Sequence, residues 1–352
     1  MKASRKQLHL LLSLVRAYSP SGRERPVAKV LLRWLTSQAV FERVLIDETG
    51  NVIAFHGPGP YLVLCGHMDT VPGKIDCGMV GNKLTGRGAV DAKAALGAMC
   101  LAATDSVKAG LTNIMFAAVV GEEGDGNGMR HLLSKKYVYS GAVFGEPTDD
   151  KIVVGYRGRL CLSVISRGKA AHASSPALGK NAILAAISFI EDLKRKVEGR
   201  GYTCTPTLIC GGMADNVVPA RCEATIDIRV PIGFSLEDIE GLVRGMERDD
   251  IRINVTDRVP PVRTGRANAL YRATCRALRL VGITPRAVTK FGSGDMNQFY
   301  VSTGVPCIAL GPGDPSLSHT DKETIELEKY VQAINIYGLL IKEYFSILGP
   351  TS

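Results

Sequence analysis

Seven histidine and acidic side chains stand at or just beyond the ends of apolar segments, where a fold could gather them. They are His67, Asp69, Asp91, Glu122, Glu123, Glu146 and His319. Taken singly, each has an ordinary interpretation, such as a turn at His67, a helix cap at Asp91 or a solvated loop at Glu122. Adjacent carboxylates repel each other, however, and Glu122–Glu123 is an adjacent pair in the glycine-rich stretch GEEGDGNG. The joint placement of all seven therefore indicates a site.

Carboxylates gathered in one cleft raise one another's pKa and destabilise the fold unless positive charge balances them. Two divalent cations would supply that charge, and two histidines with several carboxylates suit zinc best, with cobalt or manganese as alternatives. One glutamate of the adjacent pair can then bind a cation. The other can take a proton from the attacking water and deliver it to a leaving nitrogen. The pattern thus predicts metal-dependent hydrolysis of an amide.

The segments around these residues predict a layered α/β domain. Between about residues 40 and 150, strands are expected over 43–47, 51–55, 61–66, 113–120 and 141–145, with helices over 91–107 and 131–136. After residue 262, helices over 269–282 and 323–345 flank a strand over 306–311. Continuous apolar strands alternating with helices are typical of a mostly parallel sheet covered on both faces. Such sheets carry their sites beyond the carboxyl ends of the strands, where the seven side chains fall.

A second, smaller domain is predicted within the first. Strands over 158–168, 204–213, 222–232 and 251–257, with helices over 181–197 and 235–246, follow a β-α-β-β-α-β order. That order suits a ferredoxin-like α+β sheet with its helices on one face. The predicted division is residues 1–154 with 262–352 for the large domain and 155–261 for the insert. Hinges are expected near Gly155 and Pro260–Pro261.

Composition excludes several classes of protein. Of the 352 residues 45% are hydrophobic, the net charge is +9 and the nine cysteines have no metal-binding spacing. No apolar run is long enough to cross a membrane, and no basic segment interleaved with aromatics indicates nucleic-acid binding. The N-terminal segment is interpreted as an amphipathic helix rather than a secretion signal, and its expected inward residues are Leu8, Leu11, Leu12 and Val15. A cytoplasmic protein is expected.

At these residues the chain resembles the two-zinc exopeptidases and deacylases, which include acetylornithine deacetylase, succinyl-diaminopimelate desuccinylase and carboxypeptidase G. The matching segments are SPSGRE, GHMDTVP, GRGAVDAKA, GEEG, GEPT and SHTDKE. They occur in the family's order over essentially the whole chain. The resemblance implies a catalytic α/β domain with an inserted lid or dimerisation domain, and a homodimer.

The resemblance also implies a role for each member of the set. His67 and Glu146 would hold one zinc, Glu123 and His319 the other, and Asp91 would bridge the two. Asp69 would orient His67 and raise its basicity, and Glu122 would act as general base and then as general acid.

Three residues of the insert acquire roles in the same way. His172, in GYRGRLCLSVISRGKAAHASSP, would stabilise a tetrahedral oxyanion, often from the partner subunit. Asn216 and Arg229, in NVVPARCEATIDIRVP, would contact substrate, with Arg229 binding a carboxylate through two hydrogen bonds. Without the resemblance, a surface histidine and a rim arginine would be the ordinary interpretations.

The segment KFGSGDMNQF, at 290–299, narrows the choice of substrate class. It resembles the substrate loop of a subgroup that releases lysine or ornithine from LysW, a small acidic amino-group carrier protein, and it implies that Ser293 and Gly294 bind substrate. A net charge of +9 is consistent with an acidic partner. The alternatives are acetylornithine deacetylase or a related small-molecule deacylase, a peptidase, and a non-enzymatic basic protein that binds metal or nucleic acid. The presence of all five expected ligands and of Glu122 favours an enzyme.

Overall fold

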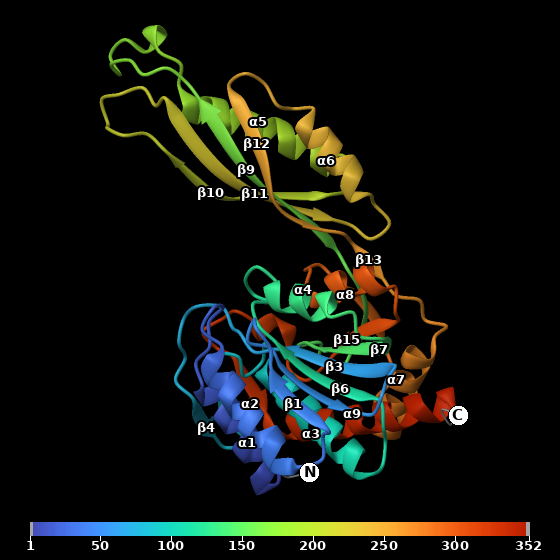
Figure 1. Ribbon diagram of the computed structural model, residues 1–352. Coiled ribbons are helices and arrows are strands. Elements are labelled where there is room, and N and C mark those ends of the chain that lie inside the picture. Colours follow the sequence, from blue (N-terminus) through green and yellow to red (C-terminus); the bar gives the residue numbers. More distant parts are fainter. Residues whose placement is uncertain (1–2, 350–352) are drawn as a thin grey trace. The chain divides into compact units, whose positions relative to one another are not determined.

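The computed structural model describes residues 3–349, which form two compact units (Figure 1). The first unit holds the chain up to Val154, Thr264–Thr289 and the chain from Gly294 onward, and the second holds Gly155–Arg263 and Lys290–Ser293. The first boundary coincides with the predicted one at 154/155, and the return lies two residues later than predicted. The prediction placed residues 290–293 in the large domain, but they belong to the second unit. The Arg157 backbone N–H donates to the Lys290 carbonyl, and the Arg157 guanidinium lies over the Phe291 ring.

The main sheet has a parallel centre and antiparallel margins. Its adjacent central strands are β6 (Ile114–Val119), β3 (Tyr61–His67), β7 (Tyr139–Gly145) and β15 (Cys307–Leu310), each parallel to the next. On one side follow β2 (Val52–His56) and β1 (Arg43–Ile46), both antiparallel, and on the other β8 (Ile152–Tyr156). β8 also pairs with β13 (Val262–Arg263) and β14 (Ala287–Lys290). The central strands are almost entirely buried because both faces are covered, so the predicted α/β class is confirmed.

Helices cover the two faces of this sheet. Figure 1 shows α3 (Lys93–Lys108) and α9 (Leu327–Leu348) on one face and α4 (Asn127–Ser134) and α8 (Asp295–Thr303) on the other. The core on the α3 side also includes α1 (Arg5–Arg16), α2 (Arg25–Gln38) and α7 (Ala269–Leu280). On the other face, Phe299 of α8 packs against the rings of Tyr139 and Phe144 on β7.

The inward face of α1 differs from the predicted one. The buried residues are Leu10, Leu11, Leu14 and Val15, whereas the predicted Leu8 and Leu12 are half-buried. The buried stripe repeats at spacings of one, three and four, as one face of a 3.6-residue helix does. A leucine-rich segment offers two overlapping stripes, and contact with α3 selects between them.

A small three-stranded sheet was not predicted. Its strands are β4 (Gly78–Val80), β5 (Lys83–Thr85) and β16 (Thr324–Glu326), in the order β16-β5-β4. Residues of β16 pair with residues of β5 that lie about 240 positions earlier, as in Thr324 with Thr85. This pairing joins the chain before Asp91 to the chain after His319.

The second unit has the predicted β-α-β-β-α-β order. It consists of β9 (Gly158–Arg167), α5 (Ala182–Glu198), β10 (Thr203–Gly211), β11 (Arg221–Val230), α6 (Leu236–Arg244) and β12 (Ile251–Val259). The strands form an antiparallel sheet in the order β10-β11-β9-β12. Its core packs Phe189 and Leu193 of α5 against sheet residues such as Ile226 and Ile228.

Two general features bear on where a site could lie. Within residues 3–349, no helix is long and apolar enough to cross a membrane.

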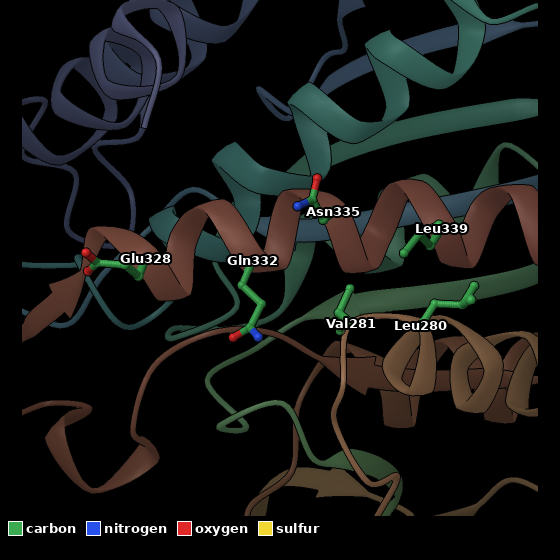
Figure 2. Close-up of a pocket in the computed structure, with 6 residues that line it drawn as sticks. All are labelled: Leu280, Val281, Glu328, Gln332, Asn335 and Leu339. Atoms are coloured by element: carbon green, nitrogen blue, oxygen red, sulfur yellow. The ribbon is translucent and has the colours of Figure 1, made fainter. Parts of the chain in front are cut away.

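A surface cavity of about 500 Å³ lies between α7 and α9, and Figure 2 shows the residues that line it. They are Leu280, Val281, Glu328, Gln332, Asn335 and Leu339. None of these is among the residues expected to do chemistry.

Candidate active site

The main sheet brings the predicted set together at one edge. His67 ends β3, Asp69 lies two residues beyond it, and Glu122–Glu123 follow β6. Glu146 directly follows β7, His319 lies in the loop after β15, and Asp91 precedes α3. Because these four strands are adjacent and parallel, their carboxyl ends meet at the same edge of the sheet.

Asp91 lies between two pairs of side chains. Its Oδ1 is 3.2 Å from Nε2 of His67, which in turn lies 3.9 Å from Oε1 of Glu146. Its Oδ2 is 3.5 Å from Nε2 of His319, which lies 2.7 Å from Oε1 of Glu123. Each oxygen of one carboxylate thus faces a different histidine–glutamate pair, which is the arrangement that a carboxylate bridging two cations requires.

The donor set fits divalent cations. Nitrogen and oxygen atoms of His67, Asp91 and Glu123 all lie within 4.8 Å of one another. Another group with such spacing among the described residues is Asp47, Glu48 and His131. There, Asp47 Oδ1 accepts the backbone N–H groups of its own turn, and Lys135 lies 3.1 Å from Glu48. In that second group a lysine therefore already pairs with one of the two carboxylates, and with a single histidine no carboxylate lies between two histidine–glutamate pairs.

Hydrogen bonding prepares His67 to act as a ligand. Its Nδ1 lies 3.0 Å from the backbone carbonyl oxygen of Asp69, which can only accept, so Nδ1 donates. In the neutral ring Nε2 then carries the free lone pair, and Nε2 is the atom that faces Asp91. The Asp69 carboxylate is farther from Nδ1, at 3.5 Å, so the backbone of Asp69 makes the closer contact.

The Asp69 carboxylate also holds the loop that carries the adjacent glutamates. Its Oδ1 accepts the backbone N–H of Glu122 at 3.1 Å and its Oδ2 that of Glu123 at 3.0 Å. Burial raises the pKa of Asp69, but hydrogen bonds from His67, Ser21 and the Glu123 backbone outweigh that effect and lower it. Asp69 therefore remains an ionised acceptor that links the His67 loop to the glutamate loop.

The two glutamate carboxylates have different nearest neighbours. Gly121, directly before them, has a φ of 72°, a left-handed conformation that glycine adopts without strain. The Glu123 carboxylate lies against His319. The Glu122 carboxylate lies against Gly294, where a β-carbon would stand 2.6 Å from Glu122 Oε1.

Without cations the carboxylates oppose one another's ionisation. Burial and the neighbouring Glu146 carboxylate raise the pKa of Glu122 well above its usual range. Burial also raises the pKa of Glu123, although His319 partly offsets it. Asp295, at the start of α8, has its pKa raised to about 8 by burial and by Asp69 and Glu146, against the effect of His67. Such a cluster is expected where positive charge completes the site.

Gly294→Ala is expected to reduce turnover because the added methyl group would displace the Glu122 carboxylate. The backbone at Gly294 is extended, with φ −169°, so alanine introduces no backbone strain there. We expect kcat to fall by about tenfold or more, since catalysis depends on positioning within about half an ångström. Steady-state kinetics with metal analysis checks this. Gly292→Ala, where a β-carbon meets open space, is the matched control. Equal kcat in the two variants would contradict the assignment.

Four predicted residues, His172, Asn216, Arg229 and Ser293, belong to the second unit. His172 and Asn216 lie on neighbouring exposed loops. The backbones of His172 and Val217 form an isolated antiparallel β-bridge, and the Ala173 N–H donates to the Asn216 carbonyl. Arg229 donates from Nη1 to Ser293 Oγ at 3.3 Å. Its Nε and Nη2 donate to the carboxylate of Asp227 on the same strand. The guanidinium edge expected to bind a substrate carboxylate through two bonds therefore already pairs with Asp227.

Several residues that shape the site were not assigned roles from the sequence. Ser21 donates to Asp69 Oδ2 at 2.7 Å, and Glu24 Oε1 accepts the Gly121 N–H at 3.2 Å. Both belong to the matching segment SPSGRE, and that match was the only sequence signal for them. Asp295 lies within KFGSGDMNQF, but nothing in the segment indicates that its side chain is buried. Arg87 lies in GRGAVDAKA and Glu323 in SHTDKE, two further matching segments, but neither segment indicates that the two side chains form a buried ion pair.

Comparison with known proteins is consistent with this geometry. The model for peptidase family M20/M25/M40 matches residues 63–343. A protein of Aeropyrum pernix, provisionally named LysW-lysine/LysW-ornithine hydrolase, is 36% identical over 94% of this chain and 93% of its own length. The LysW-lysine/LysW-ornithine hydrolase of Saccharolobus islandicus is 30% identical over 96% of each chain.

Solved structures show the same fold. Aminopeptidase PepT of Bacillus cereus has a TM-score of 0.78 at 24% identity and covers 97% of this chain and 99% of its own. An M20 family metallo-carboxypeptidase of Sulfolobus solfataricus has a TM-score of 0.81 at 18% identity, with 97% and 99% covered. A Bacillus subtilis protein described as a dinuclear metal-binding peptidase has a TM-score of 0.70 at 16% identity, with 96% of each chain covered.

The family model and the curated relatives confirm the predicted resemblance and the predicted class of enzyme, a metal-dependent hydrolase acting on carbon–nitrogen bonds. The family model spans most of the chain, and the curated relatives align over nearly their full lengths. The chain therefore belongs to peptidase family M20/M25/M40.

Proposed function

We propose that this protein is a two-zinc amide hydrolase that releases lysine or ornithine from the acidic carrier protein LysW. The observation that carries the hydrolase assignment is the placement of Asp91, whose two oxygens face two separate histidine–glutamate pairs. The carrier-linked substrate is supported by the names of the curated relatives and by the segment at 290–299.

In this proposal His67 and Glu146 would hold one cation, Glu123 and His319 would hold the other, and Asp91 would serve both. Zinc suits two imidazoles and three carboxylates, and cobalt would bind the same set. When bound, the cations would polarise the amide carbonyl and make the attacking water more acidic.

Glu122 is the proposed proton carrier of the reaction. It is the carboxylate of the adjacent pair that lies against Gly294, whereas the Glu123 carboxylate contacts His319. As general base it takes a proton from the attacking water at a carboxylate oxygen, and as general acid it returns that proton to the leaving α-nitrogen.

His172 is the proposed donor to the oxyanion of the tetrahedral intermediate. The Ser174 backbone N–H lies 3.2 Å from Nδ1 of His172 and donates to it. A neutral His172 ring therefore carries its hydrogen on Nε2, which makes Nε2 a donor suited to an oxyanion. Asn216, Arg229, Ser293 and Gly294 remain proposed substrate contacts.

A carrier-linked substrate places a physical demand on the enzyme that a small molecule does not. An acidic protein must approach the site, and a net charge of +9 would attract it over a distance set by ionic strength. The proposed setting is the cytoplasm, which agrees with nine free cysteines, eight of them at least partly buried. A small-molecule deacylase would have the same catalytic residues but would gain little from this charge.

A paired substrate test separates these functions. With metal-loaded protein, we expect hydrolysis of carrier-linked lysine or ornithine to exceed that of N-acetylornithine in kcat/KM. Rising salt should lower kcat/KM for the carrier-linked substrate more steeply, because screening weakens attraction between the two proteins. Hydrolysis of N-acetylornithine alone would establish the deacylase instead. If salt lowers kcat/KM equally for both substrates, attraction between the net charges of the two proteins does not contribute to carrier binding.

We also propose a homodimer formed through the second unit. Within the described residues β10 pairs with β11 alone, so one edge of β10 is open. Leu208 and Ile209 of β10 are 69% and 54% exposed, and Leu184 of α5 is 64% exposed. Open strand edges with apolar side chains pair readily with another chain, and α5 packs on β10 beside this edge. A second copy of the same unit offers the same edge and the same apolar groups.

Ile209→Lys is expected to convert the dimer to a monomer, because it places a charge at the apolar edge that the partner would bury. Sedimentation equilibrium of the wild-type and variant chains measures this change. Val138→Lys, at a 67% exposed position in the first unit, is the control and should leave the mass unchanged. A monomeric wild-type chain, or an Ile209→Lys chain that stays dimeric, would refute the proposed interface.

A further inference from the structure

Arg87 and Glu323 form a buried ion pair to which the proposed chemistry assigns no role. Arg87 Nη1 donates to Glu323 Oε1 at 2.6 Å, and the two side chains are 5% and 1% exposed. Buried ion pairs contribute little net stability, because removing two charges from water offsets most of their attraction. The position of this pair therefore calls for an explanation other than stability.

Glu323 fixes the backbone that leads to Asp91. Its Oε2 lies 2.7 Å from the N–H of Gly88 and accepts from it, and it is 3.3 Å from the Val90 nitrogen and 3.5 Å from the Asp91 nitrogen. The Glu323 carbonyl also accepts the N–H of Gly86 at 3.2 Å. One carboxylate thus gathers successive backbone donors of the segment that ends at the bridging aspartate.

Arg87 fixes the backbone beside His319. Its Nη1 donates to the carbonyl of Thr320 at 2.9 Å, and its Nε donates to the carbonyl of Gly73 at 2.7 Å. His319 has a φ of 64°, which is unusual for a residue other than glycine. Such a conformation persists only where its surroundings hold it, and the bond from Arg87 to the next residue is one of those restraints.

We propose that Arg87 and Glu323 are positioning residues that join the two halves of the metal centre. Arg87 holds the His319 loop, Glu323 holds the Asp91 loop, and the ion pair between them keeps the His319 imidazole at the Oδ2 side of Asp91. This inference rests on the two-cation site of the proposed function. The expected effect of this ion pair is to strengthen binding of the cation that Glu123 and His319 would hold.

Two variants separate positioning from stability. Arg87→Lys keeps the buried charge balanced, but one ammonium group cannot replace a planar fork with donors to three carbonyl or carboxylate groups. Arg87→Met combined with Glu323→Gln removes both charges, so neither remains unpaired in the interior, and the amide oxygen can still accept from Gly88. Glu326→Gln is the matched control, since Glu326 lies three residues further on in an exposed ion pair with Lys83.

The measurement is calorimetric titration of the metal-free chains with Zn²⁺. A second titration uses Co²⁺ and monitors the visible absorption of the bound cobalt. Wild type and Glu326→Gln should bind two cations with equal affinities. Arg87→Lys and the double variant should bind one cation as wild type does and the other about 10–100-fold more weakly, the range for residues that orient metal ligands. Circular dichroism of each metal-free chain should show an unchanged fold.

The possible failures are distinguishable. If both folded variants bind two cations with wild-type affinities, the positioning role is overturned and the proposed function stands. If the wild-type chain binds fewer than two cations, the two-cation site of the proposed function is overturned, and this inference falls with it.

Discussion

Glu122→Gln is expected to lower kcat by about 10²–10⁴-fold while leaving both cations bound, because it removes proton transfer without removing a ligand. The structure motivates this separation, since Glu123 contacts His319 whereas Glu122 faces Gly294. Glutamine has almost the same shape, so the contact with Gly294 and the N–H bond to Asp69 should persist. The measurement is steady-state kinetics on carrier-linked lysine together with the metal content of the same sample.

The matched control for this variant is Asp125→Asn, which makes the same chemical change in the same loop. Asp125 is exposed and accepts the Asn127 backbone N–H rather than contacting the cluster. It should keep wild-type kcat and two cations. A Glu122→Gln enzyme with normal turnover would refute the proton-carrier role. One that has lost a cation would show that Glu122 is a ligand.

His319→Ala is expected to reduce the bound cations from two to one per chain and to lower kcat by roughly 10²–10³-fold. The second cation would retain only Glu123 and the shared carboxylate of Asp91 as protein ligands. Losing a cation removes several kcal/mol of transition-state stabilisation. His319 lies 2.7 Å from Glu123 and 3.5 Å from Asp91, so no other described histidine is placed to substitute for it. Elemental analysis of the dialysed protein gives the stoichiometry.

His131→Ala is the control, because His131 is the histidine of the other group with metal-like spacing. Its Nε2 lies 2.8 Å from Glu48, near Lys135, and we interpret that group as a surface ion-pair cluster. This variant should retain two cations and normal turnover. If His131→Ala loses a cation and His319→Ala does not, the metal site has been placed at the wrong cluster.

Much of the molecule follows from patterns that are local in the sequence. Apolar runs such as YLVLCG and NIMFAAVV are buried strands wherever both faces of a sheet are covered, so their type and order could be predicted without coordinates. The position of His67 or Glu146 at the end of such a run is equally local. Since parallel strands share one edge for their carboxyl ends, the same pattern also predicted that these side chains would meet.

Other features depend on contacts between distant parts of the chain. The Asp69 carboxylate, which was expected to act on His67, also accepts the N–H groups of Glu122 and Glu123, more than 50 residues away. The burial of Asp295 could not be predicted either, because it also depends on contacts with distant segments. A side chain's partners are set by which loops pack together, and local spacing carries no record of that.

The sequence by itself determined the kinds of ligand, their order and the sheet edge at which they gather, because periodicity and residue chemistry are properties of short segments. Only the tertiary structure decided how that edge is held. The β5–β16 pairing and the Arg87–Glu323 ion pair each join residues more than 230 positions apart. Each is stable only after the chain has closed that distance, since hydrogen bonds and ion pairs form where folding excludes water and brings their partners together.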